Sequence, residues 1–173
     1  MIAGGRTVKA LHPKAKTVFI GPCLAKKAER KEPDLVGAVD YVLTYQELRD
    51  LFSVTNIDLA SLPEDNLPHA SEAGISYAYA GGVSEAVTET VHQLNPDRQV
   101  DIKTRKADGV PACKAMINAI LAGNRDGNFF EGMGCMGGCV GGPRAIIKKE
   151  EGKANVQAYG KQAVYKTPME NPY

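Results

Sequence analysis

The chain has 173 residues, and its 21 lysine and arginine residues nearly balance its 20 aspartate and glutamate residues, for a formal net charge of +1. A charge this small gives no electrostatic footprint for nucleic acid, and apolar stretches such as TVFIGPCLA (17–25) are too short to cross a bilayer. The length suffices for one substantial core, so we expect residues 1–173 to form one domain.

The first part of the chain shows strand patterns followed by a helix pattern. KTVFIG (16–21) predicts a buried strand that ends at Pro22, and a helix is expected after Leu24. AVDYVLT (38–44) predicts a second strand. Cys23 would then follow the carboxyl end of a strand, where open α/β sheets place their chemistry.

The next segment begins with a helix start signal. Thr44 and Glu47 have the spacing of a capping box, and the apolar residues that follow predict a helix over 45–53. Residues 55–74 are rich in turn formers and carry two prolines, so they predict a long surface loop.

The middle of the chain again alternates strands and helices. ISYAYA (75–80) has the alternation of a strand, SEAVTETVHQL (84–94) has an apolar stripe at helical spacing, and QVDIK (99–103) is a weak edge-strand candidate. PACKAMINAILAG (111–123) predicts a helix with a proline near its start and a glycine cap at its end.

The end of the chain is less regular, with a helix start expected within 141–153 and a weakly structured tail over 155–173. Strand patterns that alternate with helix patterns indicate the α/β class. We therefore expect a single three-layer-like lobe in which a small, mostly parallel sheet is flanked by helices.

Two cysteines lie in the glycine-rich stretch EGMGCMGGCVGGPR (131–144), which contains six glycines. Cys135 and Cys139 flank a Met-Gly-Gly spacer that favours a loop over a helix. Two thiolates in a loop of free backbone N–H groups are suited to an iron–sulfur cluster. The alternative is a pair of buried free cysteines beside a turn. A zinc site is disfavoured, because zinc sites usually have C-x2-C pairs and lack this many glycines.

The other two cysteines have different surroundings. Cys23 precedes Lys26 and Lys27, and a cation near a thiolate would offset the charge of an anionic cluster. The alternative for Cys23 is an ordinary buried cysteine, and the alternative for the two lysines is a solvated helix face. Cys113 lies in a helix pattern, where a small apolar residue is the favoured interpretation. We assign no role to the three histidines, His12, His69 and His92.

Four segments in order resemble the iron-only (di-iron) hydrogenases. FIGPCLAKKAE (19–29) is similar to the family's second cluster motif, and EGMGCMGGCVGG (131–142) is similar to its third. SEAGISYAYAGGVSEAV (71–87) and VDYVLTYQEL (39–48) match in place and order. The resemblance spans residues 1–147 and is to the C-terminal part of the large-subunit catalytic domain.

The resemblance implies an H-cluster, which is a 4Fe-4S cluster joined to a di-iron unit, and reversible hydrogen oxidation and proton reduction. It implies that Cys23, Cys135 and Cys139 are thiolate ligands of the four-iron part, with Cys139 bridging to the di-iron unit. Lys26 would contact a cyanide ligand, and Met133 would pack against the di-iron site. Lys26 and Met133 are thus the implied catalytic residues.

The chain departs from the family pattern in several places. Only 22 residues precede Cys23 and the chain has no tryptophan, so we expect the family's first motif, with its fourth cluster ligand, to lie upstream in a longer protein. Cys113 is disfavoured as that ligand because of its spacing and helix context. Gly21 replaces a methionine of better-known members, and CVGGPR (139–144) replaces their glycine-rich run before Gln-Pro.

The expected partners are the upstream half of the same polypeptide and a ferredoxin or ferredoxin-like domain, with no nucleic acid and no membrane. We expect a cytoplasmic, anaerobic enzyme, and an isolated chain that is cofactor-free and inactive. The alternatives are a hydrogen-sensing relative, a non-enzymatic iron–sulfur assembly factor of the same fold, and a structural α/β domain with incidental thiols.

Overall fold

The computed structural model of the chain describes residues 1–64 and 70–172. These residues divide into two compact units, each described by itself below. Unit 1 comprises Met1–Pro63 and Gly142–Ile146, and unit 2 comprises Glu64–Gly141 and Ile147–Tyr173. His69 and part of the loop expected over 55–74 lie outside the described residues.

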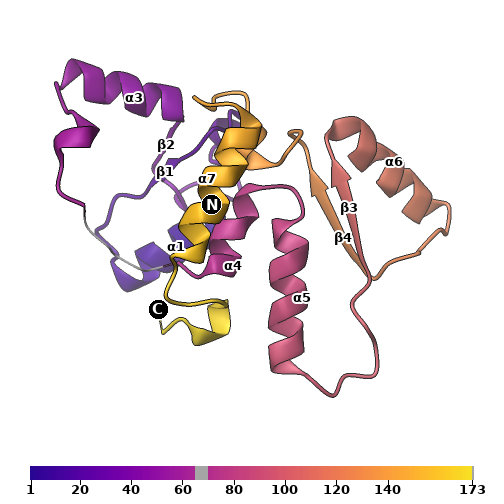
Figure 1. Ribbon diagram of the computed structural model, residues 1–173. Helices are drawn as coiled ribbons and strands as arrows, with labels where there is room; N and C mark the ends of the chain where they lie inside the picture. Colours follow the sequence, from indigo (N-terminus) through magenta and orange to yellow (C-terminus); the bar gives the residue numbers. More distant parts are fainter. Residues whose placement is uncertain (65–69, 173) are drawn as a thin grey trace. The chain divides into compact units, whose positions relative to one another are not determined.

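Unit 1 is a two-stranded parallel sheet with helices before, between and after its strands in chain order; Figure 1 labels α1, β1, β2 and α3. Its elements are α1 (Ile2–Leu11), β1 (Val18–Ile20), α2 (Ala25–Glu29), β2 (Tyr41–Leu43), α3 (Tyr45–Val54) and a 3-10 turn at Leu59–Ser61. Both expected strands are present and pair in register, Phe19 with Val42. The expectation that the first strand is buried is wrong, because Val18 is 48% exposed.

The start of α3 is fixed by the predicted capping box. The Thr44 hydroxyl accepts a hydrogen bond from the Glu47 N–H at 3.2 Å, and the Glu47 carboxylate accepts one from the Thr44 N–H at 2.8 Å. These two bonds satisfy donors that a helix N-terminus leaves without partners. The sequence signal and the structure therefore agree on where this helix begins.

The Asp40 carboxylate connects α1 to the sheet of unit 1. It accepts hydrogen bonds from the Thr17 N–H at 2.8 Å and from the Thr17 hydroxyl at 3.1 Å, and it pairs with Lys9 of α1 at 2.9 Å. The backbone bond from Thr17, followed by the Lys9 interaction, lowers the pKa of Asp40 well below its usual range. Asp40 is therefore an anion that the folded unit stabilises.

Unit 2 has a second two-stranded parallel sheet. Its elements are α4 (Glu72–Ile75), a 3-10 turn at Ser76–Ala78, α5 (Gly82–Leu94), β3 (Thr104–Asp108), α6 (Val110–Leu121), β4 (Phe129–Met133), a 3-10 turn at Cys139–Gly141, α7 (Lys149–Lys161) and a 3-10 turn at Pro168–Glu170. β3, α6 and β4 form a βαβ unit in which Thr104 pairs with Phe129 and Asp108 with Met133. Figure 1 shows α6 lying beside the β3–β4 pair. Small parallel sheets flanked by helices confirm the α/β class.

Three local predictions for unit 2 are wrong. ISYAYA (75–80) is not a strand: it contains the end of α4 and the 3-10 turn, where the Ser76 hydroxyl lies within hydrogen-bond distance of the Ala73 and Gly82 carbonyls. The weak strand expected at 99–103 is displaced, since β3 begins at Thr104. The expected weak tail is helical through Lys161 because α7 packs on α4 and the 3-10 turn after it.

The end of the chain is attached to unit 2 by its backbone and by a buried threonine. The Glu72 and Ala73 N–H groups donate to the Tyr165 and Lys166 carbonyls, and the hydroxyl of Thr167 lies 2.7 Å from the Gln93 side-chain oxygen. In residues 1–64 and 70–172, no helix is both long and apolar enough to cross a membrane.

Unit 1 should lose stability in acid because two of its carboxylates are stabilised as anions. The Lys27 hydrogen bond, then that of the Thr44 backbone, lowers the pKa of Glu47 to about 2, and that of Asp40 is lowered further. Unfolding raises both pKa values, so this stability is present above about pH 4.5 and is lost as pH falls toward 2. Thermal unfolding followed by circular dichroism across this range should show the loss.

A pair of variants tests the assignment of this acid response. Asp40→Asn should flatten the pH dependence, whereas Asp50→Asn, which removes an exposed carboxylate paired with Arg49, should leave it unchanged. Equal pH dependence in the wild type and Asp40→Asn would contradict the role given to Asp40.

Candidate metal centre

Cys135 and Cys139 lie at the two ends of a tight turn that follows β4. Gly137 and Gly138 have φ values of +88° and +87°, a conformation that side chains with a Cβ rarely adopt. The Gly138 N–H donates to the Cys135 carbonyl at 3.0 Å, which closes the turn. We call residues 135–139 the cysteine turn. The interpretation of this stretch as a loop rather than a helix agrees with the structure.

The cysteine turn packs directly on the backbone that precedes α5. The Ala80 N–H donates to the Gly137 carbonyl at 3.0 Å. A Cβ on Gly138 would lie 2.5 Å from the Ala80 nitrogen and 2.7 Å from the Tyr79 Cα. Gly138 is therefore required both by its backbone conformation and by this close approach.

The Glu131 carboxylate, in the strand that leads to the turn, is buried at 5% exposure. It accepts hydrogen bonds from the Gly81 N–H at 2.6 Å, the Ser84 N–H at 2.7 Å and the Ser84 hydroxyl at 2.6 Å. Gly81 is the N-cap of α5, so the anion also lies at the positive end of the helix dipole. This contact joins β4 to α5 four residues before Cys135.

A second carboxylate contacts the turn from the neighbouring strand. Asp108, the last residue of β3, accepts a hydrogen bond from the Gly137 N–H at 2.7 Å. The Gly109 N–H donates to the Met133 carbonyl at 2.8 Å, next to the end of β4. The carboxyl ends of both parallel strands thus meet at the cysteine turn. The sequence predicts no role for Glu131 or Asp108; Glu131 lies in the glycine-rich motif, but no sequence pattern indicates the partners of either carboxylate.

Cys113 faces the sheet of unit 2. Its half-buried sulfur lies 3.4 Å from the Met133 carbonyl oxygen and 3.7 Å from the Ala107 carbonyl oxygen. A weak S–H donor against backbone carbonyls is a packing arrangement. The contacts agree with the interpretation of Cys113 as a structural residue.

Cys23 belongs to unit 1 and follows the end of β1, as the sequence predicts. The Gly21 N–H continues the strand pairing by donating to the Leu43 carbonyl at 3.1 Å. The carbonyl of Pro22, directly before Cys23, accepts from the Arg144 N–H at 3.1 Å. Cys23 is a half-buried free thiol at the carboxyl end of a parallel strand, the position where α/β sheets bind ligands.

The two lysines of α2 both pair with carboxylates of unit 1. Lys26 forms an ion pair with Glu29, one turn further along the helix. Lys27 pairs with Glu47 of α3 at 2.7 Å. Lys27 thus joins α2 to α3. The half-buried Lys26 pairs within α2, with Glu29.

The donors of the cysteine turn fit a thiolate-ligated cluster but do not complete one. The turn offers two soft sulfur donors with little side-chain bulk between them, and a Cβ on Gly134, just before Cys135, would meet open space. Across the described residues, no three Cys, His, Asp or Glu side chains form a group that could hold a metal ion. Because Cys23 is in unit 1, convergence of the three thiols stays a prediction.

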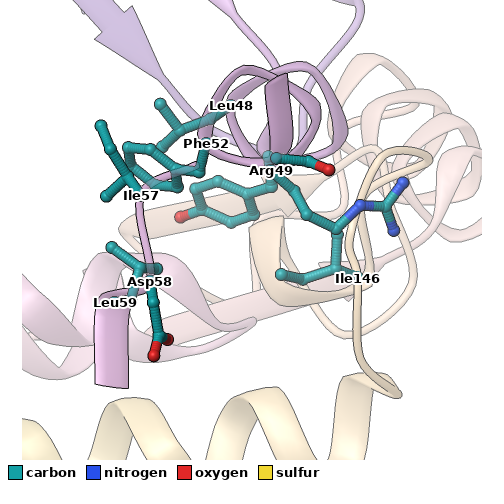
Figure 2. Close-up of a pocket in the computed structure, with 9 residues that line it drawn as sticks. Leu48, Arg49, Phe52, Ile57, Asp58, Leu59 and Ile146 are labelled. Carbon is teal, nitrogen blue, oxygen red and sulfur yellow. The ribbon is translucent and has the colours of Figure 1, made fainter. Parts of the chain in front are cut away.

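Unit 1 also has an apolar groove of about 440 Å³ along α3. Figure 2 shows Leu48, Phe52, Ile57 and Ile146 presenting aliphatic or aromatic side chains to this groove, with Asp58 nearby. No cysteine or histidine lines it. Its chemistry suits an apolar contact and not a metal, so the cysteine turn is the better candidate for the functional site.

Comparison with known proteins decides the family. The sequence model of one protein family, described as "Iron only hydrogenase large subunit, C-terminal domain", matches residues 1–143. The chain belongs to the iron-only hydrogenase family. It is 30% identical over 164 residues to the periplasmic iron hydrogenase large subunit of Nitratidesulfovibrio vulgaris, over 76% of this chain and 39% of that protein. It is 25% identical to iron hydrogenase 1 of Clostridium pasteurianum, over 92% of this chain and 34% of that one.

Solved structures of iron-only hydrogenases share the fold of this chain. One, from a study of oxygen inactivation of an FeFe-hydrogenase, superposes with a TM-score of 0.68 at 21% identity, over 99% of this chain and 60% of that one. A variant of the FeFe-hydrogenase of Chlamydomonas reinhardtii gives a TM-score of 0.64 at 21% identity, over 99% and 61%. The family resemblance of the sequence is confirmed. The chain spans just over a third of the curated relatives that it matches.

Removal of the Glu131 charge should destabilise unit 2. Glu131→Gln replaces an acceptor of three hydrogen bonds by an amide whose NH₂ faces N–H donors, and we expect a loss of about 1–3 kcal/mol in the free energy of unfolding. Urea denaturation measures it. Glu89→Gln, on the exposed face of α5, is the control and should change stability little; equal losses in both would contradict the contact.

Gly138→Ala should disrupt the cysteine turn beyond the effect of backbone strain alone. Gly123 has a similar φ of +88°, but a Cβ there would meet nothing within 4 Å. Gly123→Ala should therefore cost only about 1 kcal/mol of strain, and Gly138→Ala should cost clearly more because of the contact with Ala80 and Tyr79. Parallel urea titrations compare them, and a smaller loss for Gly138→Ala would contradict the packing described.

Proposed function

We propose that this chain is part of the catalytic domain of an iron-only hydrogenase and contributes cluster ligands to it. The cysteine turn, preformed at the ends of two parallel strands, is the observation that carries the proposal, and the family membership of the chain supports it. The whole protein would catalyse the reversible reaction of two protons and two electrons to give hydrogen. The bound H-cluster would supply the redox chemistry.

Cys23, Cys135 and Cys139 are the proposed thiolate ligands, with Cys139 as the bridge to the di-iron unit. The place of the cysteines within each unit supports the assignment. Cys23 follows β1 and the cysteine turn follows β4, and each of these strands belongs to a parallel pair whose carboxyl end is where α/β sheets bind ligands.

The fourth ligand is proposed to come from a polypeptide segment other than these 173 residues. The chain has four cysteines, and the sulfur of Cys113 contacts two carbonyls of its own sheet. An upstream segment of the same protein is the proposed source. A ferredoxin or ferredoxin-like domain is the proposed electron partner, and the cytoplasm the proposed compartment. Without these parts the chain is proposed to be inactive.

Lys26 and Met133 are the proposed residues next to the di-iron unit. Lys26 pairs with Glu29 on its own helix, whereas Lys27 joins α2 to α3 through Glu47. An ammonium group is a strong donor to an anionic ligand such as cyanide. Met133 is the last residue of β4 and lies two residues before Cys135, and its soft thioether would give the unit an apolar neighbour.

Cysteine variants of the full-length protein, matured with its cluster, test this proposal. Cys139→Ala and Cys23→Ala should each lose most of the bound iron and all hydrogen evolution, because each removes a ligand that no other thiol of the chain replaces. Iron analysis and gas chromatography of evolved hydrogen measure the two effects.

Cys113→Ala is the matched control, since its sulfur packs against backbone carbonyls. It should retain iron and activity at close to wild-type levels. Full iron content in Cys139→Ala would show that the ligand assignment is wrong. A wild-type protein that has neither iron nor hydrogenase activity would remove the proposed function.

A further inference from the structure

Asp108 holds the cysteine turn from outside it. It ends β3, and its carboxylate accepts the Gly137 N–H at 2.7 Å. Gly137 is the central residue of the turn, two positions from each cysteine, and its carbonyl is bonded to the Ala80 N–H. Both backbone groups of this one glycine are therefore fixed by neighbouring elements of unit 2.

The turn needs such a contact because its own sequence does not order it. Adjacent Gly137 and Gly138 have the largest conformational freedom of any residues, so fixing them in one conformation costs more entropy than usual. A hydrogen bond from a backbone N–H to a carboxylate is stronger than one to a neutral acceptor. The Asp108 bond is suited to offset part of that ordering cost.

We propose that Asp108 is a positioning residue that forms the Cys135–Cys139 turn before any metal binds. Its proposed consequence for the cluster rests on the function proposed above, whereas its effect on the turn does not. A ligand loop that is ordered in advance binds its metal more tightly, because binding no longer has to order it. Asp108 acts through the Gly137 backbone and is not itself a ligand.

Hydrogen–deuterium exchange of the metal-free full-length protein tests the effect on the turn. In Asp108→Ala, a peptide covering 134–142 should exchange about two- to tenfold faster than in the wild type, because the Gly137 bond is lost. Asp108→Asn keeps an oxygen acceptor at the same place and should restore slow exchange.

Asp126→Ala is the matched control, because Asp126 is an exposed carboxylate of the same unit that pairs with Arg105 instead of the turn. It should leave exchange in 134–142 unchanged. Unchanged exchange in Asp108→Ala, or equal acceleration in Asp126→Ala, would overturn the proposal. If Asp108→Ala lowers the melting temperature of the whole protein, the Asp108→Asn variant decides between the outcomes. Slow exchange of the 134–142 peptide in Asp108→Asn supports the proposal, and exchange as fast as in Asp108→Ala overturns it.

A second measurement connects the turn to the metal. In the cluster-loaded full-length protein, a chelator should strip iron from Asp108→Ala about two- to tenfold faster than from the wild type, and from Asp108→Asn at close to the wild-type rate. Equal stripping rates in all three would overturn the link to the cluster. If even the wild type binds no iron, the proposed function fails, and the exchange experiment still decides the role of Asp108.

Discussion

The buried carboxylate of Glu131 is the contact on which the candidate site depends. A buried anion is tolerated only when its oxygens are well hydrogen-bonded, and here the Gly81 and Ser84 N–H groups and the Ser84 hydroxyl at the start of α5 meet that need. These three bonds fix the middle of β4 against the N-terminus of α5. The cysteine turn begins four residues later, where the Asp108 carboxylate and the Ala80 N–H bind the backbone of Gly137.

The chemistry-bearing cysteines follow strand ends in both units. Cys23 comes after β1, and Cys135 comes after β4, and each strand is part of a parallel pair. In each unit a polar residue lies at the end of the partner strand. Thr44 caps α3 directly after β2, and Asp108, the last residue of β3, accepts a hydrogen bond from the cysteine turn that follows β4. Within each unit, parallel pairing thus brings two chain segments to one edge of the sheet. Cys23 and Cys135 are 112 positions apart in the chain, and each nevertheless follows the carboxyl end of a parallel strand in its own unit.

Local signals in the sequence predicted much of the fold. The Thr44–Glu47 box, the valine stripe of α5 and the proline and glycine around α6 each act within one element, so they could be recognised without tertiary information. Among the misassigned segments, the turn at Ser76 is closed by the Gly82 carbonyl six positions further on, and α7 packs on α4, which is far from it in sequence. β4, which no sequence pattern predicted, consists of FFEGM and is a strand because it pairs with β3. The cysteines were found by spacing and family resemblance. Glu131 and Asp108 were not, because a carboxylate that binds backbone N–H groups has no sequence pattern of its own.

The central claim is that Cys23, Cys135 and Cys139 bind one iron-bearing cluster. Anomalous diffraction at the iron absorption edge, from crystals of the matured full-length protein, locates the metal directly. The account predicts an anomalous peak within bonding distance of all three sulfur atoms. Iron bound elsewhere, or a cluster at the cysteine turn with Cys23 remote from it, would contradict the account.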